Sequence, residues 1–134
     1  MAVSFKQFSF SILVGWSSFQ SSLYFFSRGR ASWYTARVDC RQRGADLVII
    51  SSLQEQVYLS RQRYYTAWIG LTDRETEGVW KWVDETPLTV GYWMQSQPDN
   101  WRGREDCAHL HRYRRRWNVE DCNEHLSWIC EMKV

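Results

Sequence analysis

Residues 97–107 of this chain read Gln97-Pro98-Asp99-Asn100-Trp101-Arg102-Gly103-Arg104-Glu105-Asp106-Cys107. Amide and carboxylate side chains surround a proline here, next to a tryptophan and just before a cysteine. Oxygen atoms of this kind are the ligands that calcium prefers, typically about six to eight of them. A sugar also needs hydrogen-bonding oxygens beside an aromatic face. The stretch therefore predicts a cation site, a sugar site, or a site that serves both.

The bulk composition indicates one ordinary globular domain. With 134 residues, 44% of them hydrophobic, the chain is long and apolar enough to fold around its own core. It holds nine Trp, seven Tyr and six Phe, which fill cores but also serve binding surfaces. The formal net charge is only +2, which does not favour nucleic acid as a partner.

The cysteines indicate an oxidising compartment. Their even number permits two disulfides, and three pairings are possible among Cys40, Cys107, Cys122 and Cys130. A zinc site is disfavoured because no C-x2-C pair exists and because His109 and His111 lack the spacing of zinc fingers. Structural disulfides predict that the working protein is extracellular or luminal.

The N-terminal segment does not read as part of the domain. Residues 1–15 combine one lysine with a short apolar stretch that serines interrupt, which makes a poor signal peptide. No apolar run reaches the roughly 18 residues of a transmembrane helix. We expect residues 1–15 to be a degenerate signal or the remnant of a longer receptor, and residues 16–134 to form the folded domain.

Two helices and several short strands predict an α+β fold. Ser32 is the expected cap of a helix that buries residues 33, 36 and 40 and that Gly44 ends. A capping box of Ser52 and Glu55 opens a second helix through about Arg61. Strands are expected at residues 24–26, 47–50, 67–71, 79–83, 107–110, 116–118 and 128–131. Between Thr86 and Arg104 the pattern is irregular, and long irregular stretches are usually functional.

Across residues 16–132 the chain resembles the C-type lectin domains. The resemblance rests on several motifs in the family's order and at fitting spacings, which together are highly specific. They are Trp33, Ala36, Cys40, Gly44-Ala45, Leu47-Val48, Trp68-Ile69-Gly70-Leu71, Gln97-Pro98-Asp99, Glu105-Asp106-Cys107, Trp117-Asn118, Cys122 and Trp128-Ile129-Cys130-Glu131. The chain looks most like galactose-type members, the asialoglycoprotein receptor and the macrophage galactose-type lectin.

This resemblance implies a fold, a disulfide pattern and a function. The fold is two helices flanking small antiparallel sheets, with a long irregular loop region that binds the ligand. The disulfides it implies join Cys40 to Cys130 and Cys107 to Cys122. The implied function is carbohydrate binding by a secreted protein or the ectodomain of a cell-surface receptor.

The resemblance also implies a main calcium site at the proline motif. Its ligands are Gln97, Asp99, Glu105 and Asn118, which also bond sugar hydroxyls, and Pro98 is expected to be cis. The Gln-Pro-Asp order is similar to that of galactose-type members, with Trp101 stacking on the sugar; alternatively, Trp101 belongs to the core of the loop. A second calcium is expected at Asp73, Glu77, Asn100, Glu105 and Asp106, unless these acids are simply turn residues.

One residue departs from the family pattern. Val119 stands where the family has an aspartate after Trp-Asn, so one carboxylate ligand is lost. Neither Glu120 nor Asp121 is an obvious replacement: neighbouring strand residues face opposite ways, which turns Glu120 away, and Asp121 faces the same way as Val119 but lies two residues further along. Calcium affinity depends on ligand charge and number, so we expect weakened calcium binding.

Two functional hypotheses remain open. The first is a calcium-dependent lectin for glycans or glycoproteins with terminal galactose or GalNAc. The second is a calcium-independent domain of the same fold that binds a protein or an anionic glycan through Trp101 and the basic run of residues 112–116, although that run also reads as a solvated turn. An enzyme is disfavoured because no nucleophile–base motif is visible.

Overall fold

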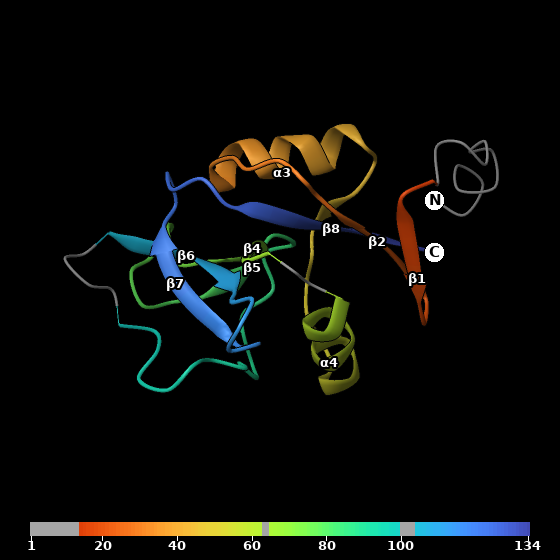
Figure 1. The fold of residues 1–134 in the computed structure, drawn as a ribbon. Helices are drawn as coiled ribbons and strands as arrows, with labels where there is room; N and C mark the ends of the chain where they lie inside the picture. The colour runs from red at the N-terminus through yellow and green to blue at the C-terminus, as the bar shows by residue number, and fades with distance from the viewer. Residues whose placement is uncertain (1–13, 63–64, 100–103) are drawn as a thin grey trace.

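The structure, a computed structural model, describes residues 14–62, 65–99 and 104–134, and within them it confirms the predicted α+β class. Figure 1 shows helix α3 above the sheet and helix α4 below it. The elements are β1 (Trp16–Phe19), β2 (Ser22–Phe26), α3 (Trp33–Gln42), β3 (Asp46–Leu47), α4 (Leu53–Gln62), β4 (Ala67–Thr72), β5 (Lys81–Trp82), β6 (Glu105–Leu110), β7 (Trp117–Asp121) and β8 (Ser127–Lys133).

The strands form one sheet in the order β1-β2-β8-β4-β6-β7. Neighbouring strands are antiparallel except β4 and β8, which are parallel and join the two halves. The short strands β3 and β5 pair with β8 and β4 at the sides of this path. In the part of the chain that the structure describes, no helix is long and apolar enough to cross a membrane.

Helix α3 forms as the sequence predicts. The N–H of Thr35 donates to the hydroxyl of Ser32 over 3.2 Å, which caps the first turn. Residues 33, 36 and 40 are the buried ones, and Gly44 after the helix has a φ of 81°, which suits glycine best. The indole N–H of Trp33 donates to the Ile69 carbonyl over 2.9 Å, fixing the helix against β4.

Helix α4 begins with half of the predicted capping box. The N–H of Glu55 donates to the Ser52 hydroxyl over 3.1 Å. The Glu55 carboxylate, however, accepts hydrogen bonds from the N–H of Ser51 at 2.9 Å and from the hydroxyl of Tyr24 at 2.6 Å. It therefore connects the helix to β2, and burial raises its pKa.

Two predicted strands are shorter than expected. Of residues 47–50, only Leu47 lies in a strand, β3 (Asp46–Leu47). The next residue, Val48, bonds to both halves of the sheet: its N–H donates to the Ile129 carbonyl over 3.0 Å, and its carbonyl accepts from the N–H of Gly70 over 2.8 Å. A Cβ at position 70 would lie 2.8 Å from the Leu47 carbonyl, so this close approach requires glycine. Of residues 79–83 only Lys81–Trp82 form a strand, since residues 77 and 78 form a turn that the N–H of Val79 closes by donating to the Thr76 carbonyl over 2.9 Å.

Both disulfides implied by the resemblance are present. Cys40–Cys130 joins α3 to β8, and Cys107–Cys122 joins β6 to the end of β7. Between the layers, aromatic side chains pack edge-on around the buried ring of Trp117, at centroid distances of 5.4–5.5 Å from Trp82, Tyr92 and Trp93. This aromatic core fixes the start of β7, where the candidate site begins.

Candidate functional site

The long irregular stretch is anchored to the first residue of β7. The N–H of Trp117 donates to the Tyr92 carbonyl over 2.9 Å, and the N–H of Met94 donates to the Trp117 carbonyl over 2.8 Å. A further bond of 3.1 Å from the N–H of Gln97 to the Met94 carbonyl turns the chain. These bonds tie the segment that leads into Gln97 to Trp117, the residue before Asn118.

The proline motif has the predicted cis peptide between Gln97 and Pro98. The Gln97 amide nitrogen lies 3.4 Å from a carboxylate oxygen of Asp99, a long hydrogen bond. The amide oxygen of Gln97 is buried and has no hydrogen-bond partner among the described residues. A buried acceptor without a partner is costly, so a donor or a cation at this oxygen would stabilise it. The predicted site residues Asn100 and Trp101 lie outside the described residues.

The remaining main-site residues come from the β6–β7 ladder. Asn118 lies opposite His109, whereas Glu105 lies opposite Asp121. Because a strand rises about 3.3 Å per residue, Glu105 and Asn118 are roughly 10 Å apart along the ladder. In the ladder, Glu105 and Asn118 therefore lie at different levels, whereas the loop that carries Gln97 is bonded to Trp117, the residue before Asn118.

Val119 is a core residue. It lies opposite Ala108 in the ladder and is 1% exposed, packed in the cluster that also contains Trp117. The next residue, Glu120, lies opposite Cys107, and burial together with the charges of Glu124 and Asp121 raises its pKa. An apolar core side chain therefore occupies position 119, where the family resemblance leads one to expect a carboxylate.

A second group of oxygens gathers beside β4. Each of Asp73, Glu77 and Asp106 offers a carboxylate oxygen within 4.8 Å of the others. The N–H of Gly78 donates to one Asp73 oxygen at 2.8 Å, while the other Asp73 oxygen and one Asp106 oxygen are buried without a partner among the described residues. Burial is the main cause that raises the pKa of Asp73 to about 7, and the carboxylates of Asp106 and Glu77 raise it further.

The comparisons with known proteins decide the family. The family model described as the lectin C-type domain matches residues 29–132. The chain belongs to the C-type lectin family.

Curated and solved relatives agree with this assignment. The domain is 40% identical over 129 residues to mouse C-type lectin domain family 4 member F, covering 90% of this chain and 23% of that protein. It is 39% identical over 129 residues to mouse asialoglycoprotein receptor 1, covering 90% of this chain and 44% of that protein. The carbohydrate-recognition domain of the mouse scavenger receptor C-type lectin superposes with a TM-score of 0.85 at 38% identity. The match covers 90% of this chain and 94% of that domain.

This C-type lectin domain spans less than half the length of these two curated relatives. Members of the family are non-enzymatic carbohydrate-binding proteins, and their domains generally bind calcium. The group of Asp73, Glu77 and Asp106 fits such an ion, because its donors are all oxygens and two of those oxygens lack partners. A cation there would satisfy the buried oxygens and offset the repulsion between the carboxylates.

Sequence patterns missed one residue that holds the start of β7 and the turn before it. Gln56 of α4 is buried, and its amide oxygen accepts a hydrogen bond of 2.8 Å from the indole N–H of Trp117. Its amide nitrogen donates to the Arg115 carbonyl over 2.9 Å. Helical spacing was a usable signal, since Gln56 precedes the buried Leu59 by three residues on the same helix face.

Proposed function

We propose that this C-type lectin domain binds glycans ending in galactose or GalNAc through a calcium ion at the proline motif. The ligands of that ion are Gln97, Asp99, Glu105 and Asn118. The observation that carries the proposal is the buried, unpartnered amide oxygen of Gln97, held beside Asp99 after a cis proline bond. The Gln-Pro-Asp order and the likeness to an asialoglycoprotein receptor support galactose over mannose.

We propose that the main site binds calcium with reduced affinity. Val119 is buried among apolar side chains, so only two carboxylates, Asp99 and Glu105, remain among the proposed ligands. A second calcium at Asp73, Glu77 and Asp106 supports the site indirectly, since Asp106 adjoins Glu105 in β6. Asn100 is proposed to complete that second set.

The proposed setting is extracellular, on a secreted protein or a receptor ectodomain. Two disulfides support an oxidising compartment. Single lectin sites bind weakly, so useful avidity for a glycoprotein requires several domains acting together.

Retention on immobilised sugars tests this function. The domain should be retarded on galactose–agarose in millimolar calcium, pass through mannose–agarose, and elute from galactose when EDTA is added. The variant Asn118→Ala should lose retention, while Asn123→Ala, an exposed residue beyond β7, should keep it. Retention on mannose alone would contradict the proposed specificity.

The second candidate is a calcium-independent domain that binds a protein or an anionic glycan. The position of Val119 in the core favours it, because an apolar side chain fills the place of an expected ligand. Binding of an anionic glycan that EDTA leaves unchanged, without galactose retention, would support this candidate. Galactose retention that EDTA leaves unchanged would overturn the calcium-bridged site.

A further inference from the structure

We propose that Arg114 and Arg116 form a subsite for an anionic group, a sulfate ester or carboxylate, on a glycan whose galactose occupies the proposed site. This inference rests on the proposed function and extends it. The two arginines line one groove together with Trp93, Met94 and Gln95 of the long loop. Two segments far apart in sequence therefore build the groove, one basic and one largely apolar.

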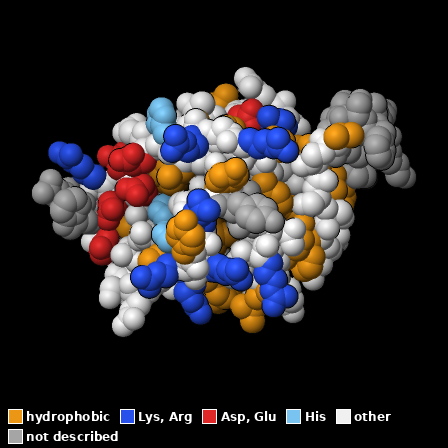
Figure 2. All heavy atoms as spheres, in the orientation of Figure 1, with side chains coloured by type: hydrophobic (Ala, Val, Ile, Leu, Met, Phe, Trp, Pro, Cys, Tyr) orange, Lys and Arg blue, Asp and Glu red, His pale blue; other side chains and the backbone are white. Residues whose placement is uncertain are grey.

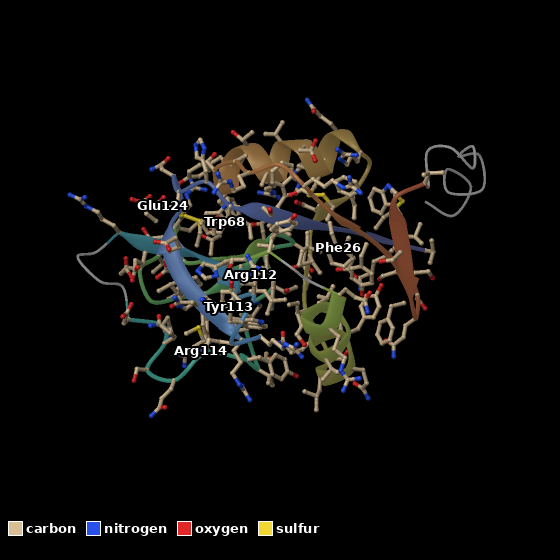
Figure 3. The ribbon with its side chains drawn as sticks, in the orientation of Figure 1. Phe26, Trp68, Arg112, Tyr113, Arg114 and Glu124 are labelled. Atoms are coloured by element: carbon tan, nitrogen blue, oxygen red, sulfur yellow. A yellow bond between two sulfur atoms is a disulfide. The ribbon has the colours of Figure 1, made fainter. Side chains whose placement is uncertain are left out.

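The basic side chains of this region form one patch. Figure 2 shows them gathered over the turn between β6 and β7, apart from acidic side chains over the opposite end of β7. Figure 3 shows Arg112, Tyr113 and Arg114 following one another along that turn. The residues from 112 to 116 are all exposed. Their guanidinium groups can therefore meet a ligand from solvent.

The guanidinium groups of this turn are free to bind. Among the residues that the structure describes, none of the arginines at positions 112, 114, 115 and 116 takes part in an ion pair. Arg112 lies over the ring of Tyr113 at 4.6 Å, which leaves Arg114 and Arg116 as the charges at the groove. Unneutralised arginines are suited to sulfate and carboxylate, whose oxygens match the planar guanidinium fork.

The backbone under these arginines is held in place. The Nδ1 atom of His111 accepts hydrogen bonds from the N–H groups of Tyr113 and Arg114, at 3.2 and 3.1 Å. The N–H of Arg115 donates to the His111 carbonyl over 2.8 Å, and the Arg115 carbonyl accepts from Gln56 of α4. A turn fixed in this way does not need to become ordered when a ligand binds, which lowers the cost of binding.

Both walls of the groove lead along the chain into the residues of the proposed galactose site. Gln95 precedes Gln97 by two residues, and Arg116 precedes Asn118 by two. The bond from Met94 to the Trp117 carbonyl ties the two walls together. Two residues span at most roughly 7 Å, and the turn at residues 95–96 shortens that reach, so a charged group on the bound galactose or on the next sugar can reach the arginines.

The experiment compares matched glycans by calorimetric titration in calcium: a neutral galactosyl disaccharide, its sulfated form and its sialylated form. We expect the sulfated or sialylated glycan to bind about three- to tenfold tighter than the neutral one. The double variant Arg114→Gln/Arg116→Gln should lose that gain and keep its affinity for the neutral disaccharide. The control Arg28→Gln/Arg30→Gln changes the charge equally at exposed positions between β2 and α3, and should keep the gain.

The outcomes separate this inference from the galactose site. Neutral binding with no gain from either charged glycan overturns the arginine subsite and leaves the proposed function standing. The subsite is also overturned if the charged glycan still binds more tightly to the Arg114→Gln/Arg116→Gln variant, or if the Arg28→Gln/Arg30→Gln control loses that tighter binding too. A gain from one charged glycan alone supports the subsite and identifies the anionic group. Binding of a charged glycan in EDTA, lost in the arginine variant, supports the arginines and overturns the calcium-bridged galactose site.

Discussion

The amide of Gln56 accepts a 2.8 Å hydrogen bond from the indole N–H of Trp117, and both groups are buried. The same amide donates to the Arg115 carbonyl over 2.9 Å. One side chain of α4 therefore holds the residue that precedes Asn118 and the turn that carries the arginines. The proposed sugar site and the proposed anion subsite share this support.

Replacing Gln56 by leucine should destabilise the domain by about 2 kcal/mol, because the Trp117 N–H and the Arg115 carbonyl then lose their partner. Chemical denaturation measures this change. Gln54→Leu, an exposed position on the same helix, should change stability by less than about 0.5 kcal/mol. Equal stability of the two variants would show that the Gln56 bonds contribute nothing.

Replacing Val119 by aspartate should couple stability to calcium. In EDTA the new charge sits unpaired among apolar side chains, so we expect a loss of about 3 kcal/mol. Calcium should restore part of this loss and bind more tightly than to the unchanged domain, because a third carboxylate joins the ligands. Denaturation with and without calcium measures both effects.

The matched control for this change is Val119→Ala. It leaves a cavity and should cost about 2 kcal/mol whether or not calcium is present. An aspartate variant whose stability responds to calcium no more than the alanine variant would place the main calcium away from position 119.

The calcium-free domain should lose stability as the pH rises toward neutrality. Burial raises the pKa of Asp73 from 3.8 to about 7 in the folded state, so the folded protein binds this proton more tightly than the unfolded chain. The contribution of protonated Asp73 to the stability of the fold is therefore fully present below about pH 4 and is lost as the pH rises through about 7. Added calcium should stabilise the domain more at about pH 8 than at about pH 5, since the ion competes with the proton.

Thermal unfolding in EDTA and in calcium checks this pH dependence. The variant Asp73→Asn has no titrating group at this position. It should therefore lose the change of stability with pH that occurs between about pH 4 and pH 7. If the stability of this variant depends on pH as that of the unchanged domain does, another acid causes the dependence. The alternative is Glu55, which is buried and bonded to Tyr24.

Trp101→Ala should abolish galactose retention without unfolding the domain, if Trp101 stacks on the sugar. Trp101→Phe keeps an aromatic face and should retain most binding. Near-ultraviolet circular dichroism and galactose affinity measure the two properties. An alanine variant that unfolds would show that Trp101 belongs to the core of the loop.

Much of the fold could be predicted from local patterns. The helix from Trp33 follows from a serine cap and a buried face at helical spacing, both of which are present. The strand lengths at residues 47–50 and 79–83 could not be predicted, because alternation shows which side chains are buried and does not show where a pairing partner ends. Val48 illustrates this, since its backbone bonds to Ile129 and Gly70 in different strands.

The candidate site was predictable in its chemistry and less so in its geometry. The gathering of Asp73, Glu77 and Asp106 and the cis bond before Pro98 agree with expectation. The burial of Val119 beside Ala108 depends on sheet register, which no local pattern specifies. The groove between Arg116 and Trp93 likewise depends on a contact between distant segments.

Calorimetric titration with calcium, followed by galactose in calcium and in EDTA, tests the central claim most directly. The account predicts calcium uptake by the folded domain, then galactose binding that EDTA abolishes. Folded protein that takes up no calcium, or that binds galactose equally well in EDTA, would contradict the calcium-bridged site at Gln97 and Asn118.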